Sequence, residues 1–388
     1  MKTMTRHINR WMLLLLTVLL TGCSSKEEEE VVEDCYLDIY VYAPDRPIVT
    51  RADVGDISVA TAQERQVNDL KIWVFRHGDV AGAKAVGYLS PDATFLNQTG
   101  QQKYQMLLDK GFADNPEPVD VYVVANAVSY VSPTTLDENT TRSQLDAAAI
   151  GTDYFGTTSL VTSAAAGLPM SAVLKNQPIS GKFPTLRIGT EEQMAMLQLT
   201  RAVSKLRFVI CRITEKGDAS TKKLVSIDDI SLDADQIPDQ SWLIQRAAPG
   251  YSYNHAAVSY GSIAKDDIPQ VPNPLDYAYE TQTAQAYEDL IDEAIGKRNL
   301  YPFGLTYFRE SDKQLKGVIS YKYQEGDVVV PTRATFSMAA PGDFLRNHSW
   351  IIYIYFMDSK IHVLSVTHIG MKKWISDGVD EPVTFFNW

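Results

Sequence analysis

Apolar and polar residues alternate in short runs along most of the chain. β-Branched and aromatic residues dominate these runs, and clusters of Gly, Pro, Asn and Asp separate them, as is typical of strands with one buried face. In one run Val203 and Lys205 alternate with Leu206 and Phe208. The pattern predicts an all-β protein built of antiparallel sandwiches, with strands at 35–42, 70–75, 104–108, 120–126, 202–213, 224–232, 317–323, 327–336, 349–357 and 360–368.

Helical patterns are few and short. Residues 281–295 carry apolar residues at helical spacing and end at Gly296, which predicts one amphipathic helix inside a long insertion. Residues 143–149 form the second candidate helix, with Ser143 as its candidate N-cap. A polar stretch with Pro and Gly between 181 and 199 precedes a strong strand, so we expect the boundary between two domains there.

The N-terminus has the organisation of an export signal. Three basic residues precede an apolar stretch at 11–20, which is too short to cross a bilayer as a permanent helix. The next residues, Leu20-Thr21-Gly22-Cys23, resemble a bacterial lipobox. We therefore expect cleavage between Gly22 and Cys23 and lipidation of Cys23, the alternative being a plain signal peptide with a chance cysteine. The acidic run at 27–30 resembles the signal for surface lipoproteins in Bacteroidetes, and it also fits a solvated tether.

Composition excludes several classes of protein. The chain has 388 residues, of which 45% are hydrophobic, enough for two separate cores. Its net charge of −12 argues against sequence-independent binding to nucleic acid or to an anionic lipid surface, since both need clustered positive charge. Of the three cysteines, Cys35 and Cys211 remain once Cys23 carries lipid. Their spacing gives no argument for a disulfide, and Cys211 lies in an apolar run that favours a buried thiol.

No arrangement of residues indicates catalysis. The sequence has no nucleophile elbow, zinc-binding His pair, phosphate-binding glycine loop or Cys-x-x-Cys pair. Asp233, Asp235 and Asp239 do not form a calcium loop, because Ile237 and Pro238 stand where such a loop needs an oxygen ligand and a glycine turn. We expect no catalytic residues, no metal and no cofactor. A surface hydrolase with an unrecognised carboxylate pair is the alternative.

Several segments together resemble the fimbrillin family, the type V pilins of Bacteroidales. The resemblance extends loosely over the chain and is weakest at 240–297. The segments that carry it are the lipobox at Cys23, the strand at 35–42, the arginine in Thr50-Arg51-Ala52, and the stretches 67–75, 120–127 and 199–206.

This resemblance implies a fold and a route of assembly. Such pilins have two transthyretin-like antiparallel β-sandwich domains in tandem, with few short helices in insertions. They reach the surface as lipoproteins, and an Arg-specific protease removes the first strand. A donor strand from a neighbouring subunit then fills the groove that the removed strand leaves open. The candidate bond here is Arg51–Ala52, because Pro47 follows the competing Arg46; the alternative is an arginine in an ordinary loop.

The resemblance also divides the chain and implies its partners. We expect a signal peptide at 1–22, a tether and propeptide with the removable strand at 23–51, and β-sandwich domains at 52–196 and 197–388. The segment 360–388, which ends in an aromatic run at 383–388, would supply either the donor or the last sandwich strand.

A polymerising stalk subunit that supports adhesion is the favoured function. A fimbrial tip adhesin, or an uncleaved surface lipoprotein that binds a host ligand or glycan, is the alternative. The expected partners are other pilin subunits, the protease, the outer membrane through the lipid anchor of the precursor, and a host or bacterial receptor, but not nucleic acid. The precursor would be an outer-membrane lipoprotein and the product part of an extracellular fimbrium.

Overall fold

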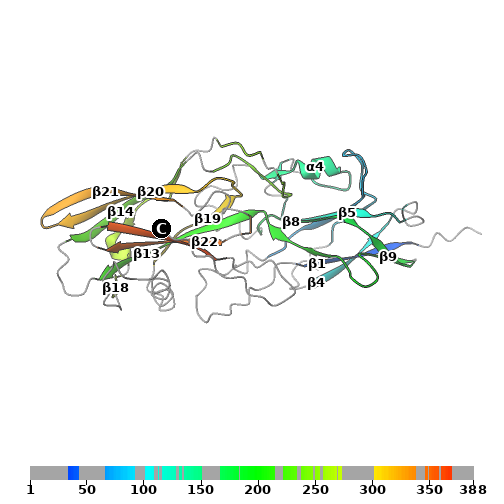
Figure 1. Ribbon diagram of the computed structural model, residues 1–388, viewed down its shortest axis with the longest axis horizontal. Helices are drawn as coiled ribbons and strands as arrows, with labels where there is room; N and C mark the ends of the chain where they lie inside the picture. The colour runs from blue at the N-terminus through cyan, green and yellow to red at the C-terminus, as the bar shows by residue number, and fades with distance from the viewer. Residues whose placement is uncertain are drawn as a thin grey trace, which may run out of the picture.

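The described part of the chain is almost entirely β-structure, which confirms the predicted all-β class. A computed structural model describes residues 34–42, 66–91, 101–108, 112, 116–127, 131–132, 135–150, 167–182, 184–214, 222–233, 237–247, 250–253, 257–268, 270–272, 301–337, 346–347, 349–357 and 360–368. The strands form two sandwiches that lie one after the other along the long axis of the molecule (Figure 1).

The first sandwich consists of two sheets that share one core. The β1 sheet runs in the order β11 (Met196–Gln198), β1 (Tyr36–Tyr42), β10 (Thr185–Ile188) and β9 (Ile179–Lys182), with β4 (Gln101–Leu107) also paired to β1. The β5 sheet runs in the order β12 (Thr200–Arg201), β8 (Met170–Gln177), β5 (Val119–Ala125), β2 (Leu70–Arg76) and β3 (Gly87–Leu89). Leu37 and Met106 of the first sheet pack in this core with Ile72 and Val121 of the second.

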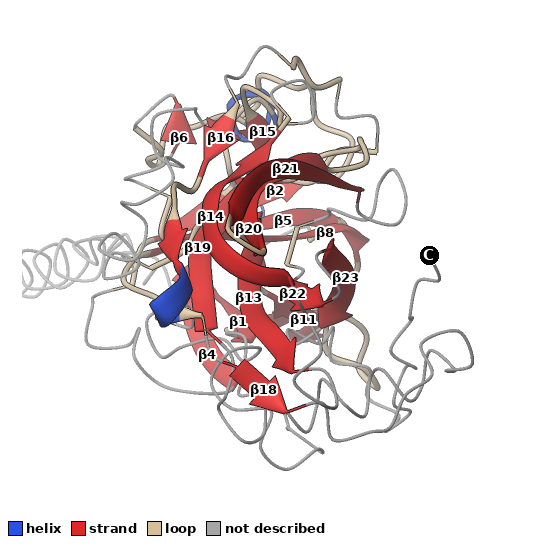
Figure 2. Cartoon of the chain, turned by 90° about the vertical axis from the view of Figure 1, so that its left-hand side faces the viewer, coloured by secondary structure: helices blue, strands red, loops and turns tan. Residues whose placement is uncertain are grey.

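The second sandwich repeats this plan. The β13 sheet runs in the order β18 (Gln270–Pro272), β13 (Val203–Thr214), β22 (Ser349–Met357) and β23 (Lys360–His368), with β19 (Tyr301–Arg309) also paired to β13. The β14 sheet runs in the order β16 (Val258–Ser259), β14 (Lys222–Leu232), β20 (Lys316–Glu325) and β21 (Val328–Ser337), with β17 (Ile263–Ala264) also paired to β14. It curves over the β13 sheet (Figure 2), and Phe208 and Ile352 pack in one core with Ile227 and Ile319.

A third layer covers the outer face of the β5 sheet. It contains β6 (Val131–Ser132), β7 (Ala149–Ile150), β15 (Ser241–Trp242) and the helix α4 (Arg142–Asp146). All residues of β5 are buried, because this layer covers one face of the strand and the β1 sheet covers the other. Trp73 and Tyr122 point into a core that also holds Leu243 and Tyr307 from the second half of the chain. The β5 sheet is therefore the middle layer of three.

The cap of α4 differs from the sequence prediction. Thr141, and not Ser143, is the N-cap. Its side chain accepts from the backbone N–H of Gln144, whose Oε1 accepts from the backbone N–H of Thr141 at 2.8 Å. Ser143 was the wrong choice because a Thr-x-x-Gln capping box satisfies two orphan N–H groups, whereas Ser143 lies inside the helix.

Two sheets are mixed, where the sequence predicted antiparallel sandwiches throughout. β1 runs parallel to β10 and β11, and β13 runs parallel to β22 and β18. Alternation of side chains reports which face is buried but not the direction of the neighbouring strand. The transthyretin-like arrangement implied by the resemblance stays a prediction.

The chain passes from one sandwich to the other near Ala202. β12 pairs with β8 of the first sandwich and ends at Arg201, whereas β13 begins at Val203 in the second. The domain boundary that we propose at 196–197 lies shortly before this point. The predicted helix at 281–295 and the aromatic end at 383–388 lie outside the described residues. Within the described ranges, no helix is long and apolar enough to cross a membrane.

Candidate functional site

β1 is an inner strand although it is the first described strand of the chain. Along one edge it pairs antiparallel with β4, from Tyr36 opposite Leu107 to Tyr42 opposite Gln101. Along the other edge its first half pairs with β10 and its second half with β11, both in parallel. The β1 sheet is therefore continuous only because β1 lies between β4 and these two short strands.

The inward side of β1 is anchored in the core of the first sandwich. Leu37, Ile39 and Val41 have exposed fractions of 0%, 0% and 2%. Burying an aliphatic side chain of this size contributes roughly 1.5–3 kcal/mol. These three side chains, together with the two ladders of backbone hydrogen bonds, make β1 a strongly bound strand.

The outward side of β1 carries a small polar cluster. Asp38 accepts hydrogen bonds from Lys103 Nζ at 2.7 Å and from Gln105 Nε2 at 3.0 Å, both on β4. The hydrogen bond to Asp38 raises the pKa of Lys103. The cluster fixes the register of β1 against β4 from the solvent side.

Removal of β1 would leave an open groove in the β1 sheet, and we call the rest of the protein the body. β4 would lie on one side of the groove and β10 and β11 on the other, and the core shared with Ile72 and Val121 of the β5 sheet would lie beneath it. Backbone N–H and C=O groups that now bond to β1 would lose their partners, and buried unpaired groups of this kind are costly. A groove of unpaired strand edges over an apolar floor can bind another extended segment in the same place.

The processing residues predicted from the sequence lie outside the described part of the chain. Gly22 and Cys23 precede its first described residue, Asp34, and Arg51 and Ala52 fall between Tyr42 and Gln66. Sequence order alone thus places β1 before Arg51 and the rest of both sandwiches after it.

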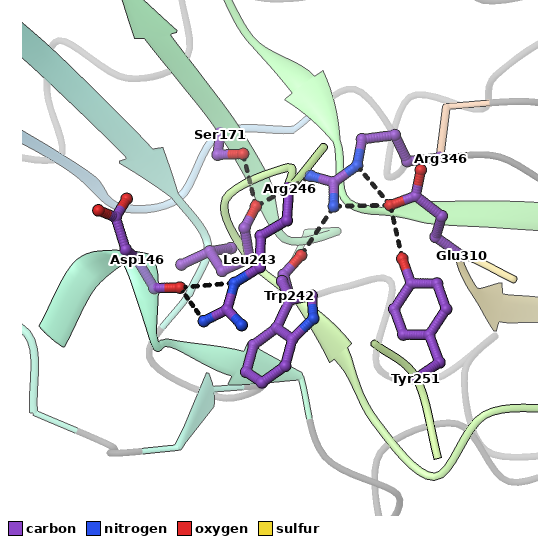
Figure 3. A network of polar contacts seen from close by, with 8 residues as sticks. All are labelled: Asp146, Ser171, Trp242, Leu243, Arg246, Tyr251, Glu310 and Arg346. Carbon is purple, nitrogen blue, oxygen red and sulfur yellow. Dashed lines mark hydrogen bonds and ion pairs between the residues drawn. The ribbon is translucent and has the colours of Figure 1, made fainter. Parts of the chain in front are cut away.

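A buried polar network joins the two sandwiches (Figure 3). Arg346 Nε and Nη2 donate to Glu310 Oε2 at 3.0 and 2.9 Å, and Tyr251 donates its hydroxyl to the same oxygen at 3.0 Å. Arg346 also donates to the backbone oxygens of Leu243 and Trp242, at 3.0 and 2.9 Å. Burial, together with the nearby Glu310 charge, raises the pKa of Tyr251, which keeps its hydroxyl a donor.

The residues just after β15 extend this network to the first sandwich. Ser171 of β8 donates to the backbone oxygen of Leu243 at 2.6 Å. Arg246 Nε donates to the backbone oxygen of Asp146, at the end of α4, at 3.0 Å, and its guanidinium lies 3.4 Å from the centre of the Trp242 ring. The segment 242–246 is thus bonded to both sandwiches. No sequence motif marked it, since its partners are distant in the chain.

The two cysteines in the described part are not bonded to each other. Cys35 is buried in the first core, and Cys211 is buried on β13 of the second sandwich. Burial raises the pKa of the Cys211 thiol to about 12. Within the described ranges, no group of His, Cys, Asp and Glu side chains could hold a metal ion.

Comparison with solved structures identifies the fold. A candidate cell adhesion protein from Parabacteroides distasonis aligns with 86% of this chain and 97% of its own, at a TM-score of 0.51 and 14% identity. This chain has the same fold. No protein-family model and no curated protein matches the sequence.

Other solved structures that align with the chain are described as fimbrial proteins. The tip fimbrial protein Mfa3 from Porphyromonas gingivalis aligns with 86% of this chain and 99% of its own, at a TM-score of 0.44 and 16% identity. A fimbrilin, FimA, from the same species aligns with 84% of this chain and 91% of its own, at a TM-score of 0.45 and 12% identity. Both scores are too low to add to the fold argument. These neighbours are described as fimbrial and cell adhesion proteins, the kind of protein that the sequence resemblance predicted.

Proposed function

We propose that this chain is a structural subunit of cell-surface fimbriae. It is exported as a lipoprotein anchored through Cys23, cut after Arg51 by an Arg-specific protease, and joined to other subunits by strand insertion. Its role is structural and adhesive rather than catalytic. A stalk position is proposed, because the sequence carries an apolar and aromatic run at 383–388 that suits a donor strand.

The position of β1 carries this proposal. β1 is an inner strand whose loss opens a groove, and it precedes Arg51 in the sequence. A cut at Arg51 would leave β1 held without a covalent link to the body, so that a competing strand could replace it. The replacement would recover backbone hydrogen bonds and apolar burial of the same kind, so the exchange can proceed at little net cost.

The donor would come from the last part of the chain. β23 pairs along its whole length with β22 and is a strand of the second sandwich. Residues 360–368 therefore belong to the body, which leaves 369–388 as the donor candidate. Deleting 384–388 should leave the monomer folded and block polymerisation; an insoluble monomer would contradict the donor role.

Proteolysis of the purified precursor tests the central step. We expect an Arg-specific protease to produce Ala52 as a new N-terminus, read by mass spectrometry, and then oligomers or fibres, read by size-exclusion chromatography and electron microscopy. Arg51→Lys should prevent both, because the protease does not cut after lysine. Arg46→Lys is the matched control and should change neither.

Two results would overturn the proposal. In one, Ala52 never appears under conditions that cut an unfolded peptide of the same sequence. In the other, Ala52 appears and β1 is released, but the body stays monomeric at high concentration.

A further inference from the structure

Asn126, directly after β5, has a side chain that bonds to two segments distant in the chain, 66–69 and Leu168. Its backbone has a φ of +55°, and its exposed fraction is 2%. Oδ1 accepts from the backbone N–H of Asn68 at 2.7 Å and, more weakly, from that of Asp69 at 3.4 Å. Nδ2 donates to the backbone oxygens of Gln66 at 2.7 Å and Leu168 at 2.9 Å. The side chain thus uses both its acceptor and its donors on backbone groups.

Gly167 provides the space for this side chain. Its φ is +77°, and a Cβ at this position would lie 2.2 Å from Asn126 Nδ2 and 2.8 Å from the backbone oxygen of Gln66. Any larger residue would displace the amide from the position in which it binds Gln66. Asn126 and Gly167 therefore form one unit, which we call the Asn126 latch.

The latch holds the first described residues after the segment that contains Arg51. Besides the bonds to Gln66, Asn68 and Asp69, the backbone N–H of Asn126 donates to the oxygen of Asp69 at 3.2 Å. Val67, between them, is buried with an exposed fraction of 5%. Residues 66–69, which lead directly into β2, are thus held in place by hydrogen bonds; we call them the entry to β2.

The sequence places another arginine immediately before this entry. Arg65 precedes Gln66, so an Arg-specific protease has a second bond of the right type, Arg65–Gln66. Hydrolysis there would break the bond between the Arg65 carbonyl carbon and the Gln66 nitrogen, with water adding to both sides. A protease must bind several residues after the scissile bond in its own cleft, and a backbone that is buried and hydrogen-bonded resists this.

We propose that the Asn126 latch decides which arginine the protease cuts. It fixes the four residues after Arg65 and so withholds the Arg65–Gln66 bond, which directs cleavage to Arg51–Ala52. The inference rests on the proteolytic step of the proposed function. The latch residues are positioning residues for this reaction, since they act through the backbone at 66–69.

Variants of the latch test this directly in the full-length precursor. In the wild type, an Arg-specific protease should yield Ala52 N-termini and almost no Gln66 N-termini. Asn126→Ala and Gly167→Ala should each increase the rate at which Gln66 termini form by about tenfold or more, because cleavage follows the population of the opened segment. Asn126→Asp keeps the acceptor for Asn68 but replaces Nδ2 with a carboxylate oxygen that faces the backbone oxygens of Gln66 and Leu168, so we expect it to increase the rate at least as much as Asn126→Ala.

Asn176 provides the matched control. It lies in β8 with a φ of +53°, close to that of Asn126. Asn176→Ala therefore carries the same backbone cost but leaves the latch intact, and it should not increase Gln66 termini. If Asn126→Ala does not fold, the comparison of Asn126→Asp with Asn176→Ala decides the question.

An Arg51→Gln background separates this inference from the proposed function. There the wild-type latch should leave the precursor uncut at Arg65, and Asn126→Asp should allow the cut, whether or not Arg51 is the processing site. Gln66 termini that form as fast with the intact latch as without it would overturn the inference. So would latch variants whose amide exchange shows 66–69 opened but whose Arg65–Gln66 bond stays uncut.

Discussion

Arg346 and Glu310 form a buried ion pair in which one carboxylate oxygen, Oε2, accepts from both Nε and Nη2 of the guanidinium, at 3.0 and 2.9 Å. Both residues have an exposed fraction of 5%. Nη1 and Nη2 of the guanidinium also donate to the backbone oxygens of Leu243 and Trp242, respectively. Arg346 thus binds both the Glu310 carboxylate and the backbone of residues 242–243. These bonds offset the cost of removing the two charges from water.

Breaking this pair should weaken the whole molecule. We expect Arg346→Met to lower the free energy of unfolding by about 3–5 kcal/mol, because it leaves Glu310 buried without its cation. Urea unfolding followed by fluorescence measures the change. Lys322→Met is the matched control: it breaks the Lys322–Asp228 pair, whose side chains are 42% and 37% exposed, and should cost less than about 1 kcal/mol. Equal effects of the two variants would contradict a special role for Arg346.

Asp120 should make the first sandwich sensitive to acid. Burial alone raises the pKa of this carboxyl, but the backbone N–H of Asn176, the His77 side chain and the Arg142 guanidinium together lower it below its usual range. A native pKa below the unfolded value means that the stabilisation is complete above about pH 4 and is lost as the pH falls through the native pKa. Chemical unfolding between pH 7 and pH 2 should show this loss.

Asp120→Asn provides the comparison for that pH series. It removes the titrating group, so stability should be lower at neutral pH and should fall less steeply below pH 4. If the acid-induced loss is equally steep in Asp120→Asn, another carboxylate causes it.

The buried thiols offer a probe of β1 release. At neutral pH Cys211 should remain protonated and resist iodoacetamide in the folded protein, since burial raises its pKa to about 12. Cys35 directly precedes β1 and is 4% exposed, so it should be protected while β1 is bound and react when β1 leaves. Peptide mass spectrometry after alkylation distinguishes the two sites. Labelling of Cys35 in the uncut precursor at the rate of an unfolded peptide would contradict the buried position of β1.

Core and surface positions on β1 should differ in their effect on stability. Ile39→Ala should cost about 2–5 kcal/mol, because it leaves a cavity in the first core. Tyr40→Ala, on the opposite face of the same strand, should cost about 1 kcal/mol or less. Thermal and urea unfolding of the two variants check this difference, and similar values would mean that β1 contributes little to the core.

Most of the long strands could be predicted from the sequence because one face of each packs in a core, but β8 and β19 were missed, since β8 ends in polar residues and β19 contains Pro302 and Gly304. The predicted range 120–126 coincides with β5 to within one residue at each end, and 349–357 and 360–368 coincide with β22 and β23. Short strands such as β10 and β15 were missed, because their few residues owe their extended form to the partner strand. Strand direction was missed for the reason that applies to β1: alternation is the same for parallel and antiparallel neighbours.

The polar contacts could be predicted only in part. The predicted strand 120–126 ends in Asn126, and asparagine is a common turn residue; its φ of +55° agrees with that. Its bonds to Gln66 and Leu168 depend on chain segments far away in the sequence, as do those of Arg346 to 242–243. No local pattern encodes such contacts, since they arise only when the layers pack.

The third layer has a consequence for how this protein can be divided. Leu243 and Tyr307 belong to the second half of the sequence but pack with Trp73 and Tyr122 of the first. A fragment that ends near Ala202 would therefore leave the outer face of the β5 sheet without part of its cover, and the complementary fragment would carry these apolar residues exposed. The division along the chain and the division in space do not coincide, so neither half can be exchanged between relatives as an independent module.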